Sequence, residues 1–242
     1  MAPSALWGAA YMDDSSALLV LEREPRELTR DYALRCLEYN ISHLHLKPGQ
    51  FLSEQSVCEQ LGLSRTPIRE AFSKLANEML VIIYPQVGTC VALIRQELVQ
   101  EARFTRWLLE CGIIKKVVAQ RTTEDLRWFE WSLECQNDIV NSEDSVRFLE
   151  LDNEFHKKFF EITRMTLTRS LVQGLLVHFD RVRLLYLQDM DWNRTIKEHT
   201  IIYDAIKASD ADAAYKALDI HLGRVLTDMD ILSKKYPRYF KS

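Results

Sequence analysis

The 242-residue sequence has few residues that interrupt helices, because it contains only 7 glycines and 6 prolines. These two residue types are the least compatible with a helix interior. Their scarcity, together with abundant leucine, glutamate, arginine and alanine, predicts a mainly α protein. Hydrophobic residues make up 47% of the chain, which is enough for a core and for one or two domains.

The chain also lacks an excess of positive charge, since its formal net charge is −4. A protein that binds nucleic acid through its overall charge is strongly basic. Any binding of nucleic acid by this chain must therefore come from a local basic patch.

Nothing in the sequence points to a membrane or secreted protein. No apolar run approaches the length of a transmembrane helix, and the first residues lack the basic start of a signal peptide. The five cysteines are scattered without zinc-finger or redox spacing, which favours reduced thiols and a cytoplasmic location. Residues 1–25 are expected to form a mobile arm, with a short helix across 16–24 as the alternative.

Three short helices followed by a β-hairpin are predicted between residues 26 and 95. Helical periodicity covers 28–46, a second helix runs from a cap at Ser53 to Gly62, and a third runs from Ser64 or Thr66 to Asn77. Two β-branched runs at 81–84 and 89–93 then flank a Pro/Gly turn. This order predicts a winged helix-turn-helix with a small hairpin wing.

From residue 96 to 236 the chain is predicted to be an all-α bundle of about six helices, because no strand signal returns. The amphipathic segments are 96–120, 123–141, 143–163, 167–188, 191–208 and 210–236.

The start of the third helix carries residues suited to DNA. The second helix of a helix-turn-helix enters the major groove with its amino end leading, where free N–H groups and the helix dipole favour phosphate. Ser64 and Thr66 can donate hydroxyl hydrogen bonds to phosphate, and Arg65 and Arg69 lie four residues apart on one side. Arginine suits bidentate contact with guanine or phosphate. Exposure of these arginines for solvation alone is the alternative.

The run LKPGQFLSEQSVCEQLGLSRTPIREAFSKLANEMLVIIYPQVGTCVALI resembles the winged helix-turn-helix of the GntR family of bacterial transcription regulators, with SRTPIREA as its most specific part. The resemblance implies that Arg65 and Arg69 contact double-stranded operator DNA, supported by Ser64, Thr66 and Gly88. Two positions depart from the family pattern. Gln55 joins the candidate set where some members carry a DNA-contacting arginine, and Met79 replaces a usual glycine.

One carboxylate and three imidazoles are expected inside the helical bundle. Asp152 and His156 lie four residues apart beside an apolar stripe, and His199 and His221 lie on apolar faces of two other predicted helices. Each histidine alone could be a hydrogen-bonded core residue. Burying all four without partners is costly, and a shared divalent metal would satisfy them together. The donor set suits zinc, nickel, manganese or iron, with zinc the first choice.

The motifs RWLLE, Asp152…His156, Glu198-His199 and Ile220-His221-Leu222 resemble the FCD effector domain of FadR-like GntR regulators. In many members of that family an aspartate and three histidines bind a metal. The resemblance implies that Asp152, His156, His199 and His221 are the ligands and that Arg106 faces an effector pocket. Arg181 or Arg183 adds positive charge there. The loop 163–166 departs from the family's Gly-Asn turn.

Together these features predict a homodimeric, metabolite-responsive transcription regulator, acting as a repressor, and not an enzyme. A small carboxylate would bind at the metal and at Arg106, and thereby change the affinity for the operator. Two alternatives stay open: a metal-dependent hydrolase, since an open metal site can activate water, and a DNA-binding protein with a purely structural metal.

Overall fold

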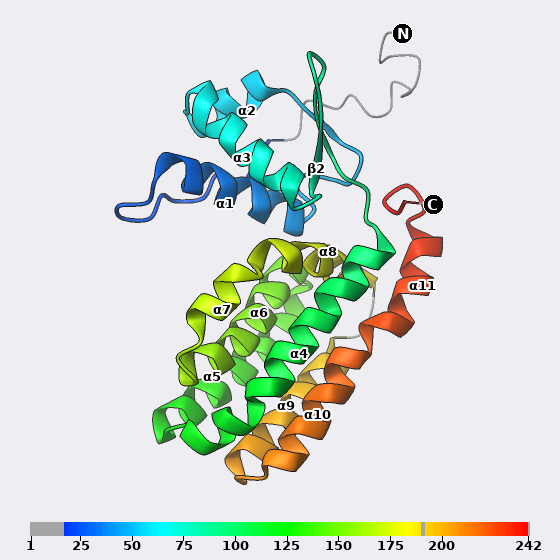
Figure 1. Cartoon of the computed structure of the whole chain (residues 1–242). Helices are drawn as coiled ribbons and strands as arrows, with labels where there is room; N and C mark the ends of the chain where they lie inside the picture. The colour runs from blue at the N-terminus through cyan, green and yellow to red at the C-terminus, as the bar shows by residue number, and fades with distance from the viewer. Residues whose placement is uncertain (1–16, 190–191, 242) are drawn as a thin grey trace. The chain divides into compact units, whose positions relative to one another are not determined.

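The computed structural model describes residues 17–189 and 192–241 (Figure 1). The chain divides into two compact units. One unit comprises the residues up to Gln96 together with Ser233–Ser242, and the other comprises Glu97–Leu232. This division differs from the predicted boundaries because it places the C-terminal segment in the first unit. The described residues are mostly helical with one small sheet, which confirms the predicted fold class.

The three predicted helices of the first unit are present as α1 (Thr29–Ser42), α2 (Glu54–Leu61) and α3 (Arg65–Asn77). The Ser53 hydroxyl caps α2 by accepting from the Ser56 amide over 3.4 Å. Gly62 ends α2 in the left-handed conformation, with φ of 64°, as a glycine after a helix often does. The apolar stripe predicted for α3 is buried, so its opposite side is left for other contacts.

The predicted wing is the hairpin of β2 (Val81–Tyr84) and β3 (Gly88–Val91). A third strand, β1 (Phe51–Leu52), was not predicted because two residues carry no periodicity; it pairs antiparallel with β3, which gives the order β1-β3-β2. Met79, just before β2, has φ of 58°. This left-handed backbone favours glycine and explains why methionine is the unusual residue there.

Two segments outside the helix-turn-helix are held on the first unit. Residues 17–24 form neither a helix nor a strand, and the buried Asn40 amide exchanges two hydrogen bonds of 2.9 Å with the backbone of Leu19. The prediction of a mobile arm is therefore wrong for these residues, and residues 1–16 lie outside the described part of the chain. Near the C-terminus, Ile94 bonds the backbone of Tyr239 and Lys241 over 2.7 and 2.9 Å.

The second unit contains more helices than the six predicted. Its helical segments are α4 (Gln96–Gln120), α5 (Thr123–Ile139), a 3₁₀ turn (Val140–Ser142), α6 (Ser145–Ile162), α7 (Thr166–Leu171), α8 (Gln173–Asp189), α9 (Asn193–Lys207), α10 (Ala211–Gly223) and α11 (Val225–Lys235), the last of which continues into the first unit. The predicted helices 167–188 and 210–236 are each divided. A glycine lies close to each break: Gly223 precedes the second, and Gly174 follows Val172, which ends the first helix with ψ of 3°.

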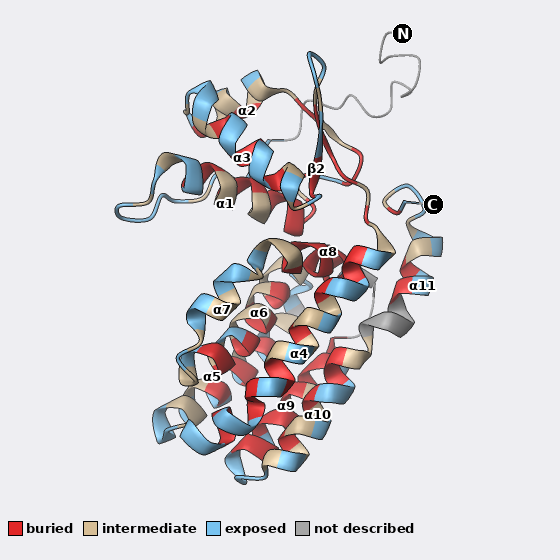
Figure 2. Ribbon diagram, in the orientation of Figure 1, coloured by how far each residue is buried: buried red, intermediate tan, exposed pale blue. Residues whose placement is uncertain are grey.

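Aromatic side chains form part of the core of the second unit. Buried and exposed stretches alternate along the helices of this unit (Figure 2). Phe129, Phe155 and Phe159 are buried from solvent, with ring centroids 5.2 to 5.8 Å apart. The ring of His199 stacks on Phe155 at 4.3 Å, so the core fixes the plane of that imidazole. All five cysteines are free thiols. Among the described residues, no helix has the length and apolar character needed to span a bilayer.

Candidate functional sites

The amino end of α3 exposes the residues predicted to contact DNA. Ser64 is the residue before the helix, and its hydroxyl makes no capping hydrogen bond, so it is able to donate to a phosphate. Arg65 and Thr66 are exposed beside it, while Ile68 and Phe72 hold the other side of α3 in the core. The first-turn N–H groups of α3 therefore lie next to two hydroxyls and a guanidinium.

The guanidinium groups of Arg65 and Arg69 share one carboxylate that the sequence analysis did not identify. Arg69 donates from Nε to Glu54 Oε2 over 2.7 Å, and Arg65 Nε lies 3.8 Å from Glu54 Oε1. Both arginine side chains are still 65% exposed, against 29% for Glu54. Glu54 is the first residue of α2, and helical periodicity relates only residues of one helix. No signal in the sequence pattern could have found this contact.

Gln55 lies at the exposed start of α2, and Gly88 lies next to the turn at the tip of the wing. The Gln55 amide donates to Glu59 Oε1 over 3.0 Å. Gly88 has φ of 147°, and a Cβ there would lie 3.2 Å from the Leu52 carbonyl oxygen. This position therefore requires glycine for the fold alone, independently of any DNA contact.

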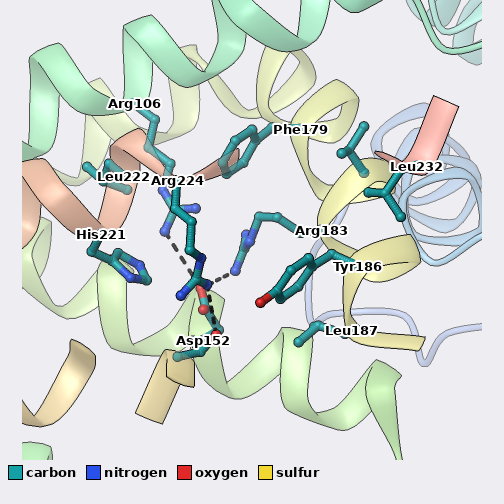
Figure 3. Close-up of a pocket in the computed structure, with 12 residues that line it drawn as sticks. Arg106, Asp152, Phe179, Arg183, Tyr186, Leu187, His221, Leu222, Arg224 and Leu232 are labelled. Carbon is teal, nitrogen blue, oxygen red and sulfur yellow. Dashed lines mark hydrogen bonds and ion pairs between the residues drawn. The ribbon is translucent and has the colours of Figure 1, made fainter. Parts of the chain in front are cut away.

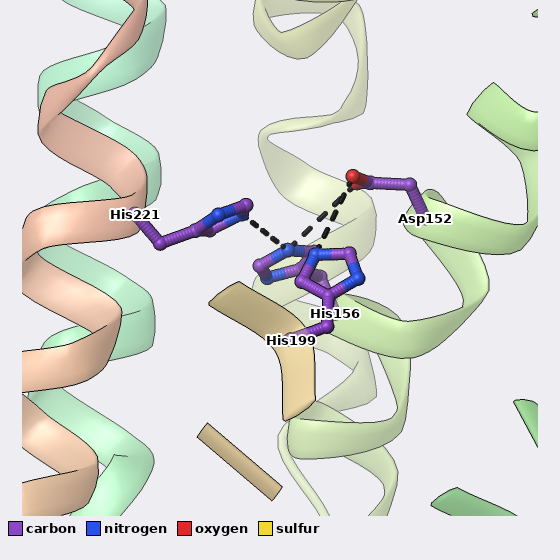
Figure 4. A group of neighbouring side chains, drawn as sticks. All are labelled: Asp152, His156, His199 and His221. Carbon is purple, nitrogen blue, oxygen red and sulfur yellow. Dashed lines mark hydrogen bonds and ion pairs between the residues drawn. The ribbon is translucent and has the colours of Figure 1, made fainter. Parts of the chain in front are cut away.

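The structure brings Asp152, His156, His199 and His221 together at one buried point (Figure 4). Asp152 and His156 come from α6, His199 from α9 and His221 from α10. One ligand-type atom from each residue lies within 4.8 Å of the others. His156 Nε2 is 3.1 Å from His221 Nε2, and His199 Nε2 is 3.5 Å from Asp152 Oδ1.

Each of the three histidines uses its Nδ1 atom for a hydrogen bond to a separate acceptor. His156 Nδ1 lies 2.5 Å from Glu110 Oε2 on α4. His199 Nδ1 lies 2.7 Å from Gln136 Oε1 on α5, and His221 Nδ1 lies 2.8 Å from Glu198 Oε2 on α9. Carboxylates and amide oxygens only accept, so each Nδ1 carries the proton. In a neutral imidazole this leaves an Nε2 lone pair, and all three lone pairs face the same point.

Burial favours the neutral form of two of these imidazoles. It lowers the pKa of His156 and His199 well below the usual value, and Arg106 lowers the pKa of His156 further. Asp152 is also buried, but the guanidinium groups of Arg183 and Arg106 hold the pKa of its carboxyl far below the normal range. The centre therefore brings one carboxylate together with three imidazole Nε2 atoms.

This donor set fits a divalent cation. Two Nε2 lone pairs at 3.1 Å repel each other unless a positive charge lies between them. His199 Nε2 is buried and has no hydrogen-bond partner. One carboxylate oxygen and three imidazole nitrogens are ligands that zinc and related ions bind. The Nδ1 acceptors are the kind of outer groups that orient histidine ligands in metal sites.

A small cavity of about 30 Å³ adjoins this cluster (Figure 3). Its lining includes the charged and polar side chains of Arg106, Asp152, Arg183, Tyr186, Thr195, His221 and Arg224. Arg106 donates from Nε to Glu110 over 2.7 Å, while its Nη2 atom is buried without a hydrogen-bond partner and lies 3.7 Å from Asp152. Arg183 contacts the same Asp152 carboxylate.

Arg181, one of the two arginines expected to add positive charge to the pocket, lies elsewhere. It is fully buried, and its Nη2 lies 2.9 Å from Nδ1 of His178 rather than in the cavity. Residues that are two positions apart in a helix are separated by about 200° around its axis. Arg181 and Arg183 therefore point to opposite sides of α8. Arg183, the alternative from the sequence, is the residue that lines the cavity.

Each of the two units matches the model of a known protein family. Residues 32–91 match the model of bacterial regulatory proteins of the gntR family, and residues 101–224 match the FCD domain. The chain is 29% identical over 202 residues to the HTH-type transcriptional repressor RspR of Escherichia coli K12, covering 83% of this chain and 89% of the relative. It is 30% identical over 192 residues to the regulator YdfH of Escherichia coli O6:H1, covering 79% and 84%.

The structure is similar to that of McbR/YncC of Escherichia coli, with a TM-score of 0.75 at 21% sequence identity, covering 87% of this chain and 99% of the other. That likeness supports the fold. The FCD match spans about half of the chain, and the gntR match covers the helix-turn-helix. The chain therefore belongs to the GntR family of transcriptional regulators, with a winged helix-turn-helix followed by an FCD domain.

Proposed function

We propose that this regulator is a metabolite-responsive repressor, whose affinity for operator DNA changes when a small organic acid binds beside a divalent metal in the second unit. The observation that carries the proposal is the convergence of three histidine Nε2 atoms on Asp152, inside the domain that follows a helix-turn-helix. The name of the relative RspR, a transcriptional repressor, supports repression as the direction of control.

The DNA-binding half of the proposal rests on α3 and the wing. Arg65 and Arg69 contact base edges or phosphates, while Ser64 and Thr66 donate to the backbone phosphates. Gln55 and Gly88 flank this surface. The exposed guanidiniums and the uncapped hydroxyl of Ser64 support this assignment.

Asp152, His156, His199 and His221 would hold the metal, with zinc the first choice among zinc, nickel, manganese and iron. A divalent ion held there supplies a Lewis-acidic positive charge to which a carboxylate can bind. Glu110, Gln136 and Glu198 keep the three imidazoles in the tautomer that exposes Nε2.

Arg106 would pair with the carboxylate of the effector. Its Nη2 donor is buried, lines the cavity and has no hydrogen-bond partner, so an anion there would satisfy it. A water needs roughly 10–15 Å³, and the cavity of about 30 Å³ thus has room for about two waters. An organic acid can bind only if the surrounding side chains move apart, which links its binding to a change in the bundle.

A homodimer would place two α3 helices on two operator half-sites. Exposed apolar side chains support dimerisation through the second unit: Phe104 and Leu108 on α4 are 51% and 54% exposed, and Ile220 on α10 is 70% exposed. The Trp107 indole donates to Asp219 over 2.7 Å and thereby joins the two helices into one face. Sedimentation of the wild type and of Leu108→Glu at micromolar concentration tests this dimer.

Metal analysis combined with DNA binding tests the central proposal. Purified wild-type protein should carry close to one divalent ion per chain, whereas His156→Ala should lose it and keep a folded helix-turn-helix. Fluorescence anisotropy with a duplex selected by the wild type should show weaker binding when an acid from a broad panel is added. Full metal content in His156→Ala refutes the ligand set, and a panel without effect on metal-loaded protein favours a structural metal.

A further inference from the structure

Glu54 holds a carboxylate against both arginines predicted to reach the DNA. It begins α2, and its two oxygens face Nε of Arg69 at 2.7 Å and Nε of Arg65 at 3.8 Å. The Glu54 side chain is 29% exposed, against 65% for each arginine. The proposed DNA surface therefore contains an anion at its centre.

The contact with Glu54 is made through Nε, which determines the N–H donors of each guanidinium that remain available for DNA. A guanidinium presents five N–H donors in a rigid plane, and the bond to Glu54 occupies the Nε donor of Arg69. The Nη donors at the far end of the plane remain for a bidentate contact with guanine O6 and N7. A long exposed side chain that is already held in one orientation loses less conformational freedom when it binds.

The negative charge of Glu54 has a second effect. Phosphate groups that approach α3 meet a carboxylate as well as two guanidiniums, so the charge weakens binding to any DNA that makes only phosphate contacts. DNA sequences whose bases bond to the oriented arginines recover this lost affinity through base contacts.

Resting on the proposed DNA-binding function, we propose that Glu54 is a positioning residue that determines operator specificity, by orienting Arg65 and Arg69 for base contact and by disfavouring other DNA. A well-formed bidentate contact accounts for roughly 5- to 150-fold of base discrimination. Loss of the Glu54 carboxylate should therefore lower the ratio of specific to non-specific affinity by about tenfold, within that range.

The test begins with selection of duplexes from a randomised 30-base-pair pool by the full-length wild type. The enriched duplex and a scrambled duplex of equal length then serve as probes for wild type, Glu54→Ala, Glu54→Gln and Glu70→Ala. Glu70 is an exposed carboxylate on α3 that makes no ion pair with either arginine, so its removal is a matched control for charge. Melting temperatures show whether each variant is folded.

We expect Glu54→Ala to lose affinity for the enriched duplex while its affinity for the scrambled duplex rises as much as in Glu70→Ala. Glu54→Gln, which keeps an acceptor oxygen, should retain more discrimination than Glu54→Ala. Equal changes on both duplexes in Glu54→Ala, whether both rise or both fall, overturn the proposal. If the wild type enriches no sequence at all, the DNA-binding function itself fails, which is a separate outcome.

Discussion

The hydrogen bond from His199 to Gln136 offers a sharp test of the metal site, because Gln136 is neutral and its replacement changes no charge. Gln136 is completely buried, and its Oε1 accepts from His199 Nδ1 over 2.7 Å. Gln136→Met keeps a similar shape but removes the acceptor. The Nδ1–H group is then buried without a partner, which costs about 1–3 kcal/mol of stability before any metal is added.

The substitution should also weaken metal binding, because the tautomer with a free Nε2 is no longer favoured. Loss of such an outer partner typically costs about 10- to 100-fold in metal affinity. Free zinc at 100 times the dissociation constant stabilises the wild type by about 2.7 kcal/mol. At the same free zinc concentration, zinc should stabilise the variant by only about 1.4 kcal/mol if its zinc affinity falls tenfold. The stabilisation should be about 0.4 kcal/mol if the affinity falls a hundredfold.

Urea unfolding at buffered free zinc and with a chelator measures both effects, and competition with a chromophoric chelator measures the affinity directly. Asn137→Leu is the control: it removes an amide from the next position of α5, where Asn137 donates to the Leu133 carbonyl over 2.9 Å. We reason that Gln136 keeps His199 in the tautomer with a free Nε2. An unchanged zinc affinity in Gln136→Met would refute this, and so would an equal loss of affinity in Asn137→Leu.

Three further predictions concern the first unit. Burial, with a neighbouring glutamate, raises the pKa of Glu38 to about 7, so its contribution to stability is full below about pH 4.5 and is lost as pH rises through 7. Urea unfolding should therefore show that Glu38→Gln stabilises the protein at pH 8 by about 1–3 kcal/mol and hardly at pH 4.5; equal gains contradict this. Arg65→Ala should weaken operator binding by about 1–3 kcal/mol in anisotropy titrations, and no loss would refute its base contact. Deletion of residues 237–242 should speed hydrogen exchange at the Ile94 amide, which donates to Tyr239; an unchanged rate would show that this bond gives no protection.

The sequence predicted the helices and the four clustered side chains because both signals are local. Asp152 and His156 are one helical turn apart, so periodicity alone places them on one face of α6. His199 and His221 each stood out as polar residues on apolar stripes. An apolar stripe identifies the side of a helix that packs into the core. The sides of α6, α9 and α10 that pack into the core meet at one place.

Other features depend on contacts between distant parts of the chain. β1 has two residues and exists because β3 pairs with it. Gly174 follows the break at Val172, but the apolar periodicity continues through both residues, so the pattern predicted one uninterrupted helix. The choice between Arg181 and Arg183 depends on the rotation of α8, which neighbouring helices determine.

Both candidate sites share one physical arrangement: donors are held by acceptors from a different helix. Glu54 of α2 holds the arginines of α3, and Glu110, Gln136 and Glu198 hold the histidines of α6, α9 and α10. A motif marks the donors because their chemistry is distinctive, but an acceptor can be any carboxylate or amide that the fold brings near. Substituting the acceptors should therefore alter specificity or metal affinity while every contacting residue remains in place.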